Sequence, residues 1–168
     1  MNTKTQDPKL EQILGYARDD AGRGMVSSAL RTLDQARAYA AKFGDEIPEA
    51  TLTKIEETAY RRGVETVLEY ARDDASRGIV IGALRMLNQA RDYAAKVGVE
   101  IPEAALQEVE QTAYRNGVET ALGYARDDAG RGMVSSALRT LDQARAYAAK
   151  ISLDITDRVQ KIEVTLKK

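Results

Sequence analysis

The chain has 168 residues, of which 30% are charged and 43% hydrophobic, yet its formal net charge is only -1. This balance excludes a bulk electrostatic attraction to nucleic acid or to an anionic membrane. The absence of Cys and His excludes disulfides, thiolate or imidazole metal ligands, and the one side chain that ordinarily titrates near neutral pH.

An internal repeat organises the whole sequence. The pentapeptide Tyr-Ala-Arg-Asp-Asp begins at residues 16, 70 and 124, a constant spacing of 54. Residues 14–42 and 122–150 are identical at all 29 positions, whereas the middle copy, 68–96, differs from them at eight. A period of this size predicts a repeat architecture. We therefore expect an N-terminal tail at 1–6 and one helical-repeat domain at 7–168, with units at approximately 7–60, 61–114 and 115–168.

The first predicted helix follows Asp7-Pro8, where a capping residue precedes a proline in the first turn. Its apolar residues recur with the helical period, namely Leu10, Ile13, Leu14, Ala17 and Ala21. A second helix is predicted from about Met25 to Phe43, and Gly44 predicts its end. The apolar stripe of this second helix comprises Val26, Ala29, Leu30, Leu33, Ala36, Ala40 and Phe43.

The third predicted helix begins at Pro48 in the first copy, which places Leu52, Ile55 and Ala59 inward, and near Thr156 in the third copy. Arg23-Gly24 predicts a turn, because glycine weakens a helix interior. At Gly63 a break and a continuous helix are equally compatible with the pattern, since the apolar stripe passes through this position almost in register. No stretch alternates with period two, so no strand is predicted.

The predicted fold class is therefore all-α, with three tandem repeats of about 54 residues stacked as a short solenoid. The alternative is an antiparallel bundle of three long helices, which would follow if the helices continued through their glycines.

The first two helices of each unit resemble the helix pair of tetratricopeptide repeats. Small residues stand at Ala17, Ala29 and Ala36, Leu33 takes the large apolar position, and Gly24 lies at the turn. The resemblance covers roughly 35 residues of each unit and implies stacked helical hairpins that act as a binding scaffold. The chain departs from the family in having Asp20 where a large aromatic is usual, in lacking the closing proline, and in its longer period.

The tyrosines and arginines of the repeated pentapeptide are the candidate partner-binding residues. Aromatic and Arg side chains dominate binding energy at protein interfaces, and stacked repeats align equivalent side chains along one surface. The candidates are Tyr16, Arg18, Tyr70, Arg72, Tyr124 and Arg126. The other interpretation of these tyrosines is a place at the edge of the core, with the ring packed and the hydroxyl in water.

The paired aspartates of the pentapeptide allow two interpretations. Stacked copies could place six carboxylates in a row that holds a hard cation such as Mg²⁺ or Ca²⁺. Asp19 and Asp20 also precede Arg23 at spacings of four and three, which favours ordinary surface ion pairs. We favour the ion pairs, because the chain lacks a calcium-binding loop pattern, and we expect no metal site.

No catalytic residues are predicted. Ser27 and Ser28 lack a histidine base, and no spacing of carboxylates specifies an acid and base pair. We therefore expect a non-enzymatic interaction scaffold without a cofactor, which binds a protein or peptide and also self-associates. The alternatives are a structural or self-assembling module, designed or consensus-like and without a ligand, and a carboxylate-lined metal-binding bundle. No nucleic-acid or membrane partner is expected, and the absence of a signal-peptide pattern predicts a cytoplasmic location.

Overall fold

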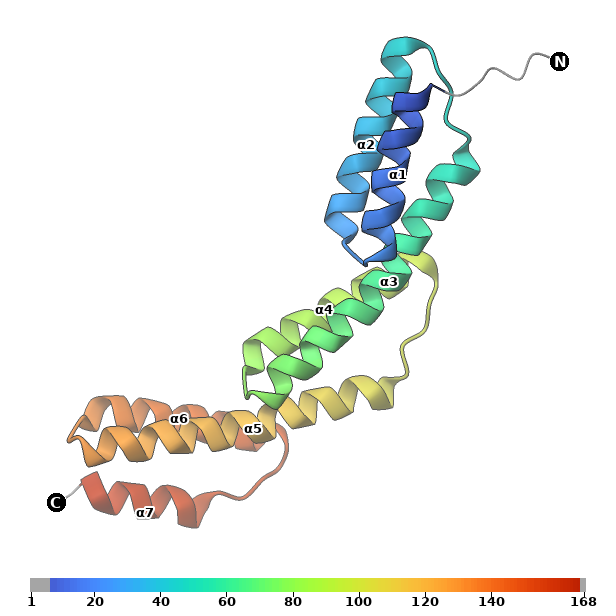
Figure 1. The fold of residues 1–168 in the computed structure, drawn as a ribbon. Coiled ribbons are helices and arrows are strands. Elements are labelled where there is room, and N and C mark those ends of the chain that lie inside the picture. Colours follow the sequence, from blue (N-terminus) through green and yellow to red (C-terminus); the bar gives the residue numbers. More distant parts are fainter. Residues whose placement is uncertain (1–6, 167–168) are drawn as a thin grey trace. The chain divides into compact units, whose positions relative to one another are not determined.

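The computed structural model describes residues 7–166, which form seven α-helices and no strand, so the all-α prediction is confirmed. The helices are α1 (Pro8–Gly22), α2 (Val26–Phe43), α3 (Glu49–Ser76), α4 (Val80–Val97), α5 (Glu103–Gly130), α6 (Val134–Lys150) and α7 (Thr156–Leu166), shown in Figure 1. Within the described residues there are two compact units. The first comprises 7–68 with 88–101, and the second comprises 69–87 with 102–166.

The start of α1 follows from its capping residue. The Asp7 carboxylate accepts a hydrogen bond from the Lys9 amide at 2.7 Å, and Pro8 occupies the first turn, where no amide donor is needed. The second oxygen of Asp7 accepts a hydrogen bond from the Tyr39 hydroxyl at 3.1 Å, which ties the start of α1 to α2. Desolvation, and then this contact with Asp7, raises the pKa of Tyr39 above its ordinary value.

The predicted turn between the first two helices is present. Gly24 has φ +71°, a left-handed conformation that glycine adopts without strain, and the Met25 amide donates to the Asp20 carbonyl at 3.0 Å. Gly78 and Gly132 have the same φ at the equivalent turns after α3 and α5. These three glycines therefore follow the ends of α1, α3 and α5, and Gly22 is the last residue of α1.

The open question at Gly63 is resolved in favour of a continuous helix. Helix α3 passes through Gly63 and α5 passes through Gly117, so the predicted third helix of one unit joins the first helix of the next. The reason is close packing: a Cβ atom at Gly63 would lie less than 3.0 Å from Val26 Cγ2 and 3.0 Å from the Tyr93 ring. Glycine lets the neighbouring helix approach, and burial offsets its low helix propensity, on the order of 1 kcal/mol.

Leucine and alanine make up most of the core of the first compact unit. Leu10, Leu14, Ala17 and Ala21 of α1 are fully buried, as predicted, and pack with residues of α2 and α3. Phe43 was wrongly predicted to lie in the buried stripe, since it is 54% exposed. It closes the last turn of α2, where its ring lies 4.5 Å from that of Tyr39 and near the Lys42 ammonium.

In the second unit, α5 and α6 lie side by side and α7 packs against them (Figure 1). Val159 and Ile162 of α7 are buried in this core, as Leu52 and Ile55 of α3 are in the first unit. The turn before α7 lacks the glycine found after α2, and Ser152 adopts the left-handed conformation with φ 52°. The Asp154 carboxylate then caps α7 by accepting from the Thr156 amide at 2.9 Å, which lowers the pKa of Asp154.

Candidate interaction surfaces

The three tyrosines of the repeated pentapeptide are exposed and belong to no core. Tyr16 on α1 is 57% exposed, Tyr70 on α3 is 60% and Tyr124 on α5 is 62%. The Tyr16 hydroxyl accepts a hydrogen bond from Gln12 at 3.1 Å, one turn earlier on the same helix. Such rings offer apolar area together with a polar tip, as interface tyrosines do.

The tyrosines at the other repeated positions pack within the units. The rings of Tyr60 and Tyr93 meet with centroids 5.6 Å apart, and those of Tyr114 and Tyr147 with centroids 5.9 Å apart. Burial, followed by the neighbouring Glu110 charge, raises the pKa of the Tyr114 hydroxyl. The edge-of-core interpretation therefore describes this group, and it does not describe Tyr16, Tyr70 and Tyr124.

Tyr16 and Arg18 lie on different sides of α1. An α-helix turns by about 100° per residue, so side chains two positions apart diverge by about 200°. Arg18 lines a groove between α1 and α3, and Tyr16 is absent from that lining. The tyrosine and arginine of a pentapeptide therefore face different sides of their helix, whereas the sequence predicted one shared surface.

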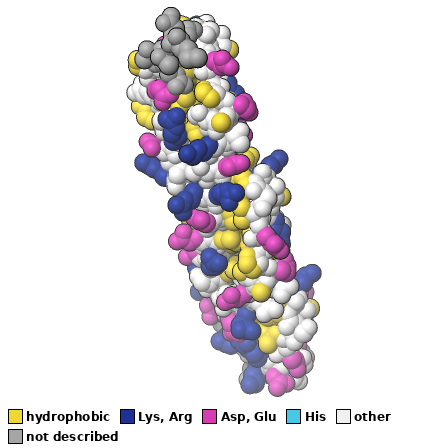
Figure 2. Space-filling view, turned by 90° about the vertical axis from the view of Figure 1, so that its right-hand side faces the viewer, with side chains coloured by type: hydrophobic (Ala, Val, Ile, Leu, Met, Phe, Trp, Pro, Cys, Tyr) yellow, Lys and Arg dark blue, Asp and Glu magenta, His cyan; other side chains and the backbone are white. Residues whose placement is uncertain are grey.

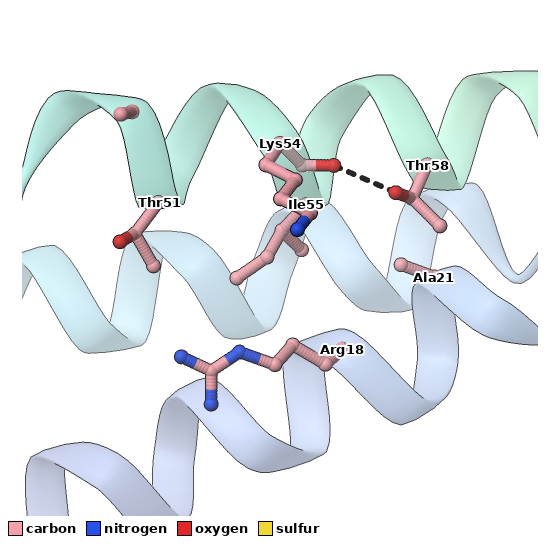
Figure 3. Close-up of a pocket in the computed structure, with 7 residues that line it drawn as sticks. Arg18, Ala21, Thr51, Lys54, Ile55 and Thr58 are labelled. Atoms are coloured by element: carbon pink, nitrogen blue, oxygen red, sulfur yellow. Dashed lines mark hydrogen bonds between the residues drawn. The ribbon is translucent and has the colours of Figure 1, made fainter.

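The groove beside Arg18 has a volume of about 430 Å³ and combines cations with hydroxyls over an apolar floor. Figure 3 shows Arg18 extending from α1 toward the turns of α3 that carry Thr51, Lys54 and Ile55. Thr58 donates its hydroxyl proton to the Lys54 carbonyl at 2.7 Å, which leaves its oxygen free to accept. The remaining lining residues are Ala21 and Ala50, and no carboxylate lines the groove.

A similar groove, also lined by cations, a threonine and apolar residues, lies in the second unit and has a volume of about 400 Å³. Arg126 and Ala129 of α5 stand where Arg18 and Ala21 stand in α1. The facing residues come from α7, namely Arg158, Lys161, Ile162 and Thr165, and Thr165 donates to the Lys161 carbonyl just as Thr58 does to Lys54. Two grooves with an Arg on one helix and a Lys on the other are thus built on different compact units.

Carboxylates next to the grooves orient the arginines. Arg18 donates to Glu11 at 3.4 Å, and Arg158 donates two hydrogen bonds of 2.6 Å to Glu119. This bidentate contact lowers the pKa of Glu119, and the nearby charge of Arg126 acts in the same direction. Each groove therefore has one cation anchored by a surface ion pair, Arg18 of α1 in the first groove and Arg158 of α7 in the second.

The middle copy of the repeat differs at this surface. Arg72 stands at the position of Arg18, but Glu108 replaces the lysine found at Lys54 and Lys161. The equivalent site of the middle copy therefore carries charges of both signs, Arg72 and Glu108. This makes it less suited than the two grooves to binding an acidic group. Lys54 and Lys161, which line the two grooves, were not among the predicted candidate residues. Their signal was a Lys-Ile pair placed four residues before a threonine in both outer copies.

Two of the paired aspartates, Asp73 and Asp20, accept hydrogen bonds from nearby side chains. Arg77 donates to Asp73 at 3.3 Å along α3, and the Ser28 hydroxyl donates to Asp20 at 2.6 Å across the first hairpin. Across residues 7–166, no three carboxylate, histidine or cysteine side chains gather so as to hold a metal ion. The face shown in Figure 2 carries charged side chains of both signs with apolar side chains between them.

None of the helices in the described part of the chain combines the length and apolar character needed to cross a membrane. Comparison with known proteins adds no family: no family model, curated protein or solved structure matches the chain.

Proposed function

We propose that the chain is a non-enzymatic scaffold that binds a peptide or protein segment through the Arg and Tyr side chains of α1, α3 and α5. The observation that carries the proposal is the groove at Arg18 and its counterpart at Arg126, each lined by at least two cations and no carboxylate. Stacking of the repeats as a solenoid belongs to the same proposal, because it would set equivalent side chains along a continuous surface.

The chemistry of the grooves favours an acidic partner. A carboxylate between Arg18 and Lys54 would have a charged donor on each side, while the apolar floor at Ile55 would pack against its methylene groups. The exposed rings of Tyr16, Tyr70 and Tyr124 provide further contact sites for apolar or aromatic groups of the partner. Net charge near zero and the interspersed acidic residues argue against nucleic acid as the partner. A cytoplasmic location completes the proposal.

The test measures binding of a fluorescent oligoglutamate peptide to the full chain by anisotropy, with oligolysine as the control for charge sign. Arg18→Ala and Arg126→Ala are expected to weaken binding several-fold each, because each removes one charge-assisted contact worth about 1 kcal/mol. Arg31→Ala removes an exposed arginine outside both grooves and is the matched control. Equal effects of all three variants would contradict a site at the grooves.

The rival function is a self-assembling module without a ligand. Light scattering separates the two, because a self-assembling module gains mass with concentration, whether or not Arg18 and Arg126 are present. A carboxylate-lined metal site is not proposed, since the described carboxylates do not cluster.

A further inference from the structure

The groove between α5 and α7 is lined by three cations, Arg126, Arg158 and Lys161. One carboxylate is bound to this cluster, because Arg158 donates two hydrogen bonds of 2.6 Å to Glu119. Within residues 7–166 neither Arg126 nor Lys161 makes an ion pair, although Arg126 is close enough to Glu119 to help lower its pKa. The cluster therefore has two positive charges in excess.

The groove between α1 and α3 has a smaller excess of positive charge. Its cations are Arg18 and Lys54, and Arg18 donates to Glu11 at 3.4 Å. One positive charge is therefore in excess there, which matches the single charge of a carboxylate. Helix α3 continues past this groove to Ser76, so a groove of this kind does not require a short second helix.

The walls of the second groove also have hydrogen-bond donors to spare. A guanidinium carries five N–H donors and an ammonium carries three. Arg158 uses two of its donors for Glu119, and the side chains of Arg126 and Lys161 make no hydrogen bond within the described part of the chain. Donors from both α5 and α7 are therefore directed at one groove, whose lining also includes the buried, apolar Ile162.

A phosphate monoester matches this cluster better than a carboxylate does. It carries up to two negative charges near neutral pH, since its second pKa is about 6, and it has three strong acceptor oxygens. Arginine binds phosphate through two parallel hydrogen bonds, and lysine binds it as a point charge. A carboxylate has one charge and two oxygens, so it would leave part of the positive charge of the second groove unmatched.

We propose that the groove between α5 and α7 binds the phosphate of a phosphothreonine or phosphoserine side chain, and that the groove between α1 and α3 prefers a carboxylate. This inference rests on the proposed function, because it specifies the chemistry of the peptide that the scaffold binds. A phosphorylated side chain fits better than a free phosphate ion, since Ala129 and Ile162 offer its carbon atoms an apolar contact that an inorganic ion does not use.

The test is an NMR titration of the ¹⁵N-labelled full chain with three capped peptides that differ at one position. Each has the sequence Ala-Glu-Ala-Xaa-Ala-Glu-Ala, in which Xaa is phosphothreonine, glutamate or threonine. Signals of α7 report binding at the second groove, because the sequence of α7 differs from those of α3 and α5. We expect the phosphothreonine peptide to shift these signals and to bind about tenfold more tightly than the glutamate peptide.

Two lysine variants locate the site of the phosphate. Lys161→Gln and Lys54→Gln remove the same charge from equivalent, exposed positions of the two grooves. Lys161→Gln is expected to weaken binding of the phosphothreonine peptide by about tenfold, and Lys54→Gln should change it little. Equal losses of affinity in both variants would overturn the assignment of the phosphate to the second groove.

The pH dependence of binding separates the two ligand chemistries. From pH 5.5 to pH 7.5 the phosphate gains most of its second charge, so affinity for the phosphothreonine peptide should rise by about fourfold. The glutamate peptide should show no such rise, because its carboxyls, with a pKa of about 4.3, are already ionised. The chain has no histidine, so the change reports the ligand. A phosphothreonine peptide whose affinity is the same at both pH values would overturn recognition of the dianion.

The remaining outcomes separate this inference from the proposed function. If the phosphothreonine peptide binds no more tightly than the glutamate peptide, this inference fails and the proposed function stands. If neither peptide binds, the proposed function is contradicted as well. Inorganic phosphate that binds as tightly as the phosphothreonine peptide would overturn the inference. Tighter binding to phosphatidylcholine vesicles that contain phosphatidic acid than to the peptide would also overturn it, because the ligand would then be a lipid headgroup.

Discussion

Val80 of α4 rests against Gly117 of α5 so closely that a methyl group at position 117 would lie less than 3.0 Å from the valine side chain. Gly123, two turns later on α5, has no atom within 4 Å of the place where its Cβ would be. One helix therefore contains a glycine that packing requires and another that packing does not require.

We expect Gly117→Ala to lower the free energy of unfolding by up to about 2 kcal/mol, since overpacking costs about 1–3 kcal/mol and the gain in helix propensity returns about 1 kcal/mol. Gly123→Ala should raise it by up to about 1 kcal/mol, through propensity alone. Urea denaturation followed by circular dichroism compares the two midpoints. Similar shifts for both variants would contradict a packing role for Gly117.

The turn glycines permit a second comparison, because Gly78 and Gly132 share φ +71° but differ in their surroundings. Gly132→Ala should cost about 1–2 kcal/mol, the penalty of the left-handed conformation for a residue with a Cβ. Gly78→Ala should cost more, because its Cβ would also press on the backbone of Asn116. The difference between the urea midpoints of the two variants reports the cost of the contact between the new Cβ and Asn116. Equal midpoints would show that α5 moves aside without loss of stability.

The Arg158–Glu119 pair predicts a pH-dependent contribution to stability. The pKa of Glu119 is lowered in the folded state, so the pair stabilises the fold above the unfolded pKa of about 4.3, and this contribution is lost as pH falls through the lower folded value. Because both side chains are substantially exposed, the contribution at pH 7 should be no more than about 1 kcal/mol.

Glu119→Gln should therefore destabilise the chain at pH 7 and have little effect at a pH below the folded value, as measured by urea denaturation at both pH values. The matched variant is Glu65→Gln, whose partner Arg62 lies on the same helix. A Glu119→Gln effect that is the same at both pH values would show that the carboxylate charge is not responsible.

Glu108→Lys should create a third basic position in the middle copy, since Glu108 stands where the outer copies have Lys54 and Lys161. If the grooves bind acidic groups, the affinity for oligoglutamate should rise several-fold, a gain of about 1 kcal/mol. Glu103→Lys makes the same change in net charge near the start of α5 and is the control. Equal gains for both variants would indicate a general charge effect and no specific groove.

Local signals were sufficient to predict much of the fold. The cap at Asp7, the stops at Gly24 and Gly44, and the buried stripe through Leu10 and Leu14 depend on interactions within a few residues, so the sequence contains them directly. The exposed position of Phe43 was not predicted, because the helical period shows which residues share a face of α2. It does not show which residues at the end of that face remain exposed.

The sequence by itself determined that the chain is helical and where its tight turns lie, because the helical period and the conformational preference of glycine act over a few residues. It also contains the 54-residue repeat directly, since the copies are recognised by comparing the sequence with itself. Only the tertiary structure decided that α3 and α5 continue through Gly63 and Gly117, that Arg18 lines a groove together with Lys54 while Tyr16 does not, and that Val134 is exposed. Each of these features depends on which side chain of a neighbouring helix packs against the residue. The spacing of residues along the chain does not reveal which side chains are close in space.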